Sequence, residues 1–257
     1  MSAIDILSVG YIATVTLANP GKLNALDVAM WEGLTAAFAS LSQKPNLRCV
    51  IVRGAGGNFA AGADIDEFST VRSTIEQGIH YHTNIIAPAL DAISACPIPT
   101  VAAIEGVCIG GGLEIACACD LRIAAPSARF GIPVNRLGFP LAPGELQGLL
   151  QLIGKARTLE ILLEGRVFDA AEAKEKGLLH RIADDVLTAS RACAKQIAKG
   201  APLAARTNKQ LVRRLSAAPE PLNRQELNAA FSFLASQDYE EGVQCFLTKR
   251  NPVFQGK

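Results

Sequence analysis

The sequence carries almost no net charge and few of the residues that bind metal ions. Its 257 residues include 25 lysines and arginines against 24 aspartates and glutamates, so the formal net charge is +1. A nearly neutral chain offers no general electrostatic attraction for nucleic acid or for an anionic membrane. There are three histidines, and the seven cysteines include no pair with the CxxC spacing of zinc sites. We therefore expect no metal site, and free thiols in a reducing cytoplasm.

Long hydrophobic runs and the common nucleotide-binding motifs are also missing. No uninterrupted apolar stretch reaches the ~18 residues of a membrane-spanning helix. The opening MSAIDILSVG lacks the basic start and the apolar run of a signal peptide. The dinucleotide-binding pattern GxGxxG does not occur, and GLLQLIGKA lacks the glycine spacing and the Ser or Thr of a phosphate-binding P-loop. These absences argue against a membrane protein and against the usual nucleotide-binding folds.

Hydrophobic residues, in contrast, make up 49% of the chain, which is enough for a large buried core. Short apolar runs predict two strands around Gly10 within residues 6–20, and further strands near 48–54, 99–106 and 120–126. A helical pattern starts after Asp27, the expected N-cap, and places Trp31 and Phe38 on its apolar face as core residues. From about Pro143 onward the sequence is helical and punctuated by glycines. The sequence thus predicts an α/β fold, with a core over residues 1–195 and a helical region over residues 196–257.

Three consecutive glycines stand out in the stretch EGVCIGGGLEIACACD, residues 105–120. One interpretation is a tight strand-to-helix turn in which Gly110, Gly111 and Gly112 permit close packing of helix and sheet. The other is a group of main-chain N–H donors at a helix start, where the helix dipole favours a negative charge. Glu114 lies one turn into the same helix, so the second interpretation would join an acid–base group to a stabilised oxyanion.

A second loop of small residues occurs in GGNFAAGADIDEF, residues 56–68. This loop is one of five motifs that together cover essentially the whole chain. The other four are the glycine triplet, ARFGIPVNRLGFP, GRVFDAAEAKEKGLLHRI and the closing FLTKRNPVF. In this order the sequence resembles the crotonase, or enoyl-CoA hydratase/isomerase, superfamily. The resemblance implies a crotonase-like spiral of ββα units with a C-terminal helical trimerisation region. It also implies a cytoplasmic homotrimer or dimer of trimers that acts on an acyl-CoA thioester.

The resemblance further implies that the main-chain N–H groups of Ala63 and Gly111 bind the thioester oxygen, on which enolate charge develops. Side chains at the glycines would then crowd the thioester. No permanent cofactor is implied, because coenzyme A is part of the substrate. The residues that the resemblance assigns to coenzyme A binding are Lys22, Leu23, Ala60, Ala61, Asp64, Ile65 and Lys249. Asp64, like Asp66, is equally interpretable as a cap within its loop.

One position departs from the family pattern. Glu114 matches one of the two glutamates of the hydratases, and it is the predicted principal acid–base group, but the position of the other glutamate is occupied by Val134. Glu145 begins a later helix, where its carboxylate either offsets the helix dipole or assists catalysis. His80 and His82 lie in the segment from Ile65 to Pro88 that would shape the acyl pocket, and we expect surface positions for both.

The resemblance therefore predicts hydration, dehydration or double-bond migration in an enoyl-CoA. Because Val134 can neither activate water nor transfer a proton, two alternatives stay open. One is a different acyl-CoA reaction, such as decarboxylation, C–C cleavage or thioester hydrolysis, with Glu145 or a histidine assisting. The other is an acyl-CoA-binding protein without catalytic activity.

Overall fold

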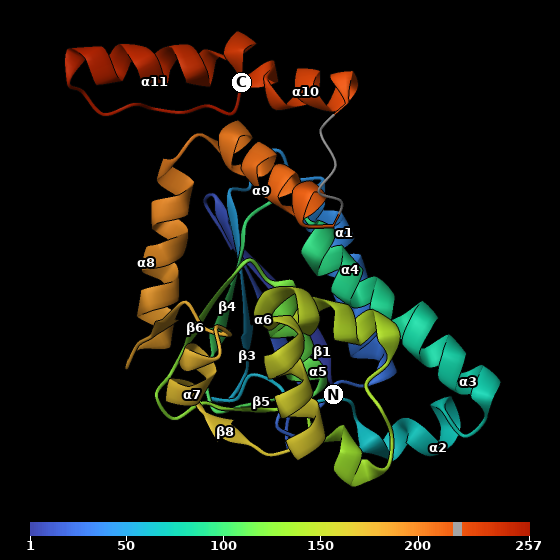
Figure 1. Cartoon of the computed structure of the whole chain (residues 1–257). Coiled ribbons are helices and arrows are strands. Elements are labelled where there is room, and N and C mark those ends of the chain that lie inside the picture. Colours follow the sequence, from blue (N-terminus) through green and yellow to red (C-terminus); the bar gives the residue numbers. More distant parts are fainter. Residues whose placement is uncertain (218–222) are drawn as a thin grey trace.

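Two β-sheets organise the chain in the computed structural model, which describes residues 1–217 and 223–257 (Figure 1). The main sheet has the strand order β1-β2-β3-β4-β6-β9, and a smaller sheet has the order β5-β7-β8. The strands are β1 Ala3–Val9, β2 Ile12–Ala18, β3 Cys49–Gly54, β4 Thr100–Ile104, β5 Val107–Ile109, β6 Leu121–Ala124, β7 Arg129–Gly131, β8 Phe168–Asp169 and β9 Arg181–Ile182. Strands β1 and β2 form an antiparallel hairpin, and the rest of the main sheet is parallel.

The long strands confirm the prediction of an α/β fold, whereas the short ones were not foreseen. Strands β5, β7, β8 and β9 contain only two or three residues each, too few to show a periodic pattern. Strands β5, β7 and β8 form the smaller sheet, and β9 adds to the edge of the main sheet beside β6. The N–H of Arg129 donates to the carbonyl of Gly106, which brings β7 alongside β5.

The central strands of the main sheet, β3 and β4, are buried on both faces. Alternate residues of β3 contact two separate hydrophobic clusters, with Val50 and Val52 in the larger and Cys49 and Ile51 in the smaller. The smaller cluster is completed by helix α8 (Val186–Lys199), which packs across β3 and β4. Helices α1 (Val28–Ser42) and α4 (Ala87–Ala95) cover the other face, as Figure 1 shows. Such burial matches the near-continuous apolar runs of the parallel strands.

The remaining helices are α2 Phe68–Val71, α3 Ile75–His80, α5 Gly111–Ala118, α6 Pro143–Glu164, α7 Ala170–Glu175, α9 Pro202–Ala217, α10 Arg224–Ala230 and α11 Gln237–Thr248. Short 3₁₀ turns occur at Ile65–Glu67, Val134–Leu137 and Ser232–Ala235. Helix α1 begins as predicted, because the Asp27 side chain accepts a hydrogen bond from the N–H of Met30 at 2.8 Å. Trp31 and Phe38 are fully buried, as expected for that helix.

The segment between β3 and α4 had no interpretable pattern in the sequence. It contains α2, α3 and a π-helical segment, Tyr81–Ile86, that runs directly into α4. A π-helical turn is wider than an α-helical one and is often found at functional sites. Here it directs Tyr81 and Ile86 into the protein interior, where both are buried. The segment therefore forms one wall over the end of the main sheet.

The C-terminal region is helical, as the fold prediction stated. In Figure 1, α10 and α11 lie across the top of the view, beyond α9 and away from the sheets. The chain end contacts the core, where the Arg48 guanidinium donates to the carbonyl of Phe254 at 2.6 Å. Within the part of the chain that the structure describes, no helix combines the length and apolar character needed to span a membrane.

Candidate active site

Two backbone segments meet at the end of the main sheet. One is the loop 60–64, and the other is the turn 109–112, which leads from β5 into α5. A Cβ atom placed on Gly62 would lie 3.3 Å from the carbonyl oxygen of Ile109 and 3.7 Å from the nitrogen of Gly111. Gly62 and Gly110 have φ values of +105° and +50°, which L side chains rarely adopt. Glycine is therefore needed at both positions for the two segments to lie backbone against backbone.

At this junction the main-chain N–H groups of Ala63 and Gly111 have no partner in the described part of the chain. Two hydrogen bonds to Leu26 hold the loop. The N–H of Leu26 donates to the carbonyl of Gly62 at 2.7 Å, and the carbonyl of Leu26 accepts from the N–H of Asp64 at 2.8 Å. Between these bonds the N–H of Ala63 has no acceptor among the described residues, and the same holds for the N–H of Gly111 at the start of α5. Both residues line one pocket. Unpaired donors at a helix start favour a negatively charged oxygen.

The glycines of the triplet also have a packing role at the turn from β5 into α5, although two of them pack against the loop 60–64 and helix α1 and not, as the first interpretation expected, against a strand. A Cβ atom on Gly112 would lie 2.3 Å from the carbonyl oxygen of Ala60, and one on Gly111 would lie 2.9 Å from the Trp31 ring. At both positions, an added Cβ atom would lie closer to other protein atoms than van der Waals contact allows. The requirement for glycine at these two positions thus comes first from the contact of α5 with its neighbours.

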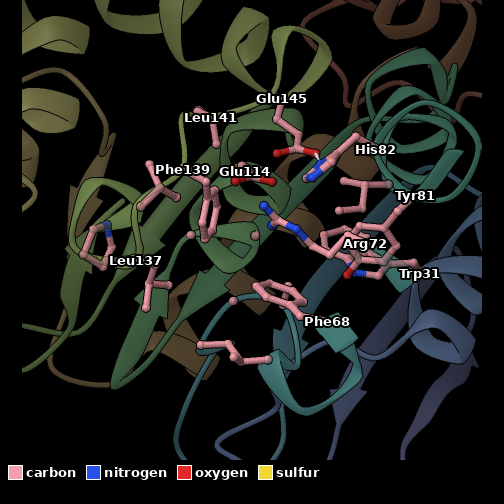
Figure 2. Close-up of a pocket in the computed structure, with 18 of the residues that line it drawn as sticks. Trp31, Phe68, Arg72, Tyr81, His82, Glu114, Leu137, Phe139, Leu141 and Glu145 are labelled. Atoms are coloured by element: carbon pink, nitrogen blue, oxygen red, sulfur yellow. Dashed lines mark hydrogen bonds and ion pairs between the residues drawn. The ribbon is translucent and has the colours of Figure 1, made fainter. Parts of the chain in front are cut away.

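The pocket itself encloses about 80 Å³ and is mostly apolar. The titratable side chains that line it are Arg72, Tyr81, His82, Glu114 and Glu145. They come from three parts of the chain: the segment between β3 and α4, the first turn of α5 and the first turn of α6. Figure 2 shows the carboxyl groups of Glu114 and Glu145 on the same side of the pocket, with His82 beside Glu145.

Glu114 is 7% exposed, at the pocket wall. Burial raises the pKa of its carboxyl well above the usual range, and the negative charge of Glu145 raises it further. The protonated form of Glu114 is therefore favoured over a wider pH range than in water. A neutral carboxyl beside unpaired N–H donors can give a proton to a bound molecule and take it back.

Glu145 is buried and forms a pair with His82. Its Oε1 lies 2.5 Å from the Nδ1 of His82, whose ring also packs edge-on against Tyr81. The expectation that His82 lies on the surface is wrong, because the π-helical segment turns its ring into the pocket; His80 is exposed as expected. Glu145 lies in the first turn of α6, where a negative charge interacts favourably with the helix dipole.

The residues predicted to bind coenzyme A fall into two groups. Ala61 and Ile65 line the pocket next to Ala63, and Ala60 is fully buried beneath them. Lys22 lies outside the pocket and bonds Asp64 and Asp66 at 2.6 and 2.8 Å, while Asp64 also caps the turn Ile65–Glu67, which confirms its role as a loop cap. The two remaining residues, Leu23 and Lys249, are exposed and do not contact the pocket.

Several pocket residues had no signal in the sequence. Phe68, Arg72 and Tyr81 come from the segment between β3 and α4, and Phe139 comes from the loop before α6. Neither stretch shows a helical or strand period from which a buried face could be inferred. Among residues 1–217 and 223–257, no three His, Cys, Asp or Glu side chains are grouped so as to hold a metal ion.

A family model described as Enoyl-CoA hydratase/isomerase matches residues 9–257 of the chain. A protein of Mycobacterium tuberculosis named "Probable enoyl-CoA hydratase echA8" is 37% identical over 249 residues, which cover 95% of this chain and 94% of the relative. The Delta(3,5)-Delta(2,4)-dienoyl-CoA isomerase of Dictyostelium discoideum is 28% identical and covers 95% of this chain and 88% of its own length.

Solved structures show the same likeness. The enoyl-CoA hydratase/carnithine racemase of Magnetospirillum magneticum has a TM-score of 0.96 at 45% identity and covers 100% of this chain and 97% of its own. The enoyl-CoA hydratase of Bacillus anthracis has a TM-score of 0.88 at 30% identity, and the match covers 100% of this chain and 99% of that protein's chain. The mixed α/β fold with a helical C-terminal region is therefore shared with these structures.

Proposed function

Because the chain belongs to the enoyl-CoA hydratase/isomerase family, and so is an enzyme of that family, we propose that it adds water to the double bond of a 2-enoyl-CoA. The observation that carries this reaction is the presence of two buried carboxyl groups, Glu114 and Glu145, in a pocket that also holds two unpaired N–H groups. Hydration needs one group to activate water and one to protonate carbon, and two carboxyls can share this work.

The N–H groups of Ala63 and Gly111 would donate to the oxygen of the thioester carbonyl. As water attacks C3, electrons move through the double bond onto this oxygen, which gains enolate charge. Preorganised donors in a water-poor pocket stabilise such charge, and the loss of one such donor costs about 3–4 kcal/mol in comparable sites. Since the packing of loop 60–64 against turn 109–112 fixes both donors, no reorganisation is required during the reaction.

Glu145 would act as the base and Glu114 as the acid. The Glu145 carboxylate takes a proton from water while the water oxygen bonds to C3. The neutral Glu114 carboxyl, whose pKa is raised by burial, gives its proton to C2. Transfer of a proton from Glu145 back to Glu114 restores the starting state. In the family pattern a second glutamate does this work, but this chain has Val134 at that position. Glu145 would do the same work from the first turn of α6.

His82 would act as a positioning residue for Glu145. With a proton on Nδ1, the ring donates to Oε1 of Glu145, which holds the carboxylate in one orientation. The reaction requires no permanent cofactor, because coenzyme A arrives as part of the substrate. Lys22, Leu23, Ala60, Ala61, Asp64, Ile65 and Lys249 remain the proposed contacts to it.

Two further features belong to this proposal. The C-terminal region exposes large apolar side chains, among them Leu234, Leu247 and Val253, which supports a role in self-association as a trimer or dimer of trimers. The seven cysteines are all free, which supports a cytoplasmic location.

Purified protein with crotonyl-CoA tests the proposal directly. We expect formation of 3-hydroxybutyryl-CoA, and we expect Glu114→Gln to abolish it. A 3-enoyl-CoA is the second substrate to assay, because a lone proton shuttle by Glu114 would instead move the double bond. Binding of both esters by calorimetry without turnover of either would contradict the proposed reaction and leave a protein that only binds acyl-CoA.

A further inference from the structure

The pocket contains a cation that the proposed reaction does not use. Arg72 follows helix α2 directly and is half-buried. Its guanidinium lines the pocket together with Glu114 and Phe139. In Figure 2 this group points into the pocket, between the rings of Phe68 and Phe139 and toward the Glu114 carboxyl.

Aromatic rings hold the guanidinium in place. Its central carbon lies 4.1 Å from the centroid of the Phe139 ring and 4.5 Å from that of the Phe68 ring. The two rings contact each other edge to face, with centroids 6.0 Å apart. Cation–π contacts stabilise the charge and fix the position of the group, but they do not use its N–H donors in ordinary hydrogen bonds.

No acceptor in the described part of the chain satisfies those donors. No carboxylate there lies within ion-pair distance of Arg72, and no carbonyl or hydroxyl oxygen lies within hydrogen-bond distance of its guanidinium. The two carboxyls of the pocket are otherwise engaged, because Glu145 bonds His82 and burial favours the neutral form of Glu114. A half-buried guanidinium without an anion is an unbalanced charge inside an apolar pocket.

We propose that Arg72 binds a carboxylate at the far end of the acyl chain, so that the substrate is the CoA thioester of a short unsaturated dicarboxylic acid. The planar guanidinium suits a carboxylate because two parallel N–H···O bonds can form. The cavity of about 80 Å³ favours a short chain.

This inference rests on the proposed function, since it places the acyl group between the N–H donors and Arg72. A phosphate of coenzyme A is another anion that a guanidinium could bind. The apolar lining and the place of Arg72 beside Glu114 favour the acyl end, and the matched substrates below separate the two sources.

Calorimetry with two saturated esters tests recognition without turnover. Butyryl-CoA and glutaryl-CoA share the coenzyme A portion, and glutaryl-CoA carries a terminal carboxylate in addition. We expect wild-type protein to bind glutaryl-CoA at least tenfold more tightly, and Arg72→Met to reduce this preference to within twofold. Arg72→Lys, which keeps the charge, should retain part of it. Arg136→Met, an exposed arginine outside the pocket lining, serves as the control and should retain all of it.

The corresponding unsaturated pair, crotonyl-CoA and glutaconyl-CoA, tests the same preference in turnover. The ratio of their kcat/KM values should favour glutaconyl-CoA and should fall 10- to 100-fold in Arg72→Met. Equal weakening of both esters by Arg72→Met would assign Arg72 to coenzyme A and overturn the inference, as would a wild type without preference. Turnover of neither ester, with the glutaryl-CoA preference intact, would contradict the proposed reaction while supporting the carboxylate site.

Discussion

The Nδ1 atom of His82 lies 2.5 Å from Oε1 of Glu145, although the two residues are 63 positions apart in the sequence. His82 comes from the π-helical segment before α4, and Glu145 comes from the first turn of α6. Their contact brings a histidine–carboxylate pair to the pocket that is also lined by Ala63 and Gly111, whose N–H groups are unpaired. In this protein, the proposed second carboxyl is therefore held by a residue from another segment.

Replacement of Glu145 should slow the reaction strongly. Glu145→Gln removes the proposed base but keeps the size of the side chain, and we expect kcat for the enoyl-CoA substrate to fall by about 10²–10⁴-fold. The dissociation constant of a saturated CoA ester should change by less than threefold. Glu76→Gln, at an exposed position on α3, serves as the control. A Glu145→Gln enzyme with nearly wild-type kcat would show that this carboxyl only offsets the helix dipole.

Replacement of His82 should act through Glu145. His82→Leu removes the Nδ1 donor, whereas His82→Asn places an amide donor near the same position. We expect kcat to fall about tenfold in the leucine variant and less in the asparagine variant, since one hydrogen bond to a charged group contributes about 1.5–3 kcal/mol at most. When Glu145 is already glutamine, the same His82 substitutions should have little further effect.

Glu114→Gln should reduce turnover without reducing binding. The proposed role of Glu114 is to give a proton to C2, which the amide cannot do, so we expect kcat to fall by about 10²–10⁴-fold. Calorimetry with a saturated CoA ester should give a dissociation constant close to that of the wild type. Turnover within a few fold of wild type would contradict the role assigned to Glu114.

The same substitution predicts a pH-dependent change in stability. Burial raises the pKa of Glu114 in the folded protein, whereas the unfolded chain keeps a value of about 4.3. Between these two values the folded state binds more protons than the unfolded state, so the free energy of unfolding falls as pH rises. Glu114→Gln does not titrate.

The free energy of unfolding of the Glu114→Gln protein, relative to that of the wild type, should therefore increase with pH above about 4.3. The full increase is about 1.4 kcal/mol for each unit of difference between the folded and unfolded pKa of Glu114. The gain should level off once pH exceeds the folded value. Urea denaturation of both proteins over a pH series measures this difference, and Glu76→Gln gives the baseline for an exposed glutamate. A stability difference that does not vary with pH would show that burial leaves the Glu114 pKa unchanged.

Gly112→Ala should destabilise the fold and the site together. The new methyl group would lie 2.3 Å from the carbonyl oxygen of Ala60, so α5 or the loop 60–64 has to move. Overpacking of this kind lowers the free energy of unfolding by about 1–3 kcal/mol. The displaced N–H groups should also lower kcat.

Gly148 in helix α6 offers a matched control for this substitution. A Cβ atom there would have its nearest neighbour, the Cβ of Cys117, at 3.9 Å. Alanine in a helix interior is favoured over glycine by about 0.5–1 kcal/mol, so Gly148→Ala should leave stability unchanged or raise it. If Gly112→Ala were equally harmless in urea denaturation, the close contact with Ala60 would not constrain the fold.

Much of the fold could be predicted because its strands and helices carry periodic patterns. Strands β3 and β4 are continuous apolar runs, and α1 has a cap at Asp27 followed by an apolar face. The glycine triplet and Glu114 were also recognisable, since a backbone turn and a carboxylate at a helix start are features of local sequence. These signals come from residues that are close together along the chain.

The other half of the pocket has no such signal. His82 and Arg72 lie in a segment of short helical pieces whose buried side is decided by contacts with residues 139–145, far along the chain. Glu145 was foreseen as a candidate, but its burial and its partner depend on that same packing. Tertiary contacts between these two segments therefore place the three side chains, and local propensity could not reveal their arrangement.

The contact between loop 60–64 and turn 109–112 affects how the substrate specificity of such an enzyme can evolve. The proposed oxygen-binding donors belong to the main chain, so they persist through almost any mutation that preserves the glycines. Most side chains of the pocket that would surround the acyl chain come from residues 65–86 and 133–145. Laboratory evolution toward other acyl groups should hence accumulate its mutations in these two stretches and leave the backbone junction intact.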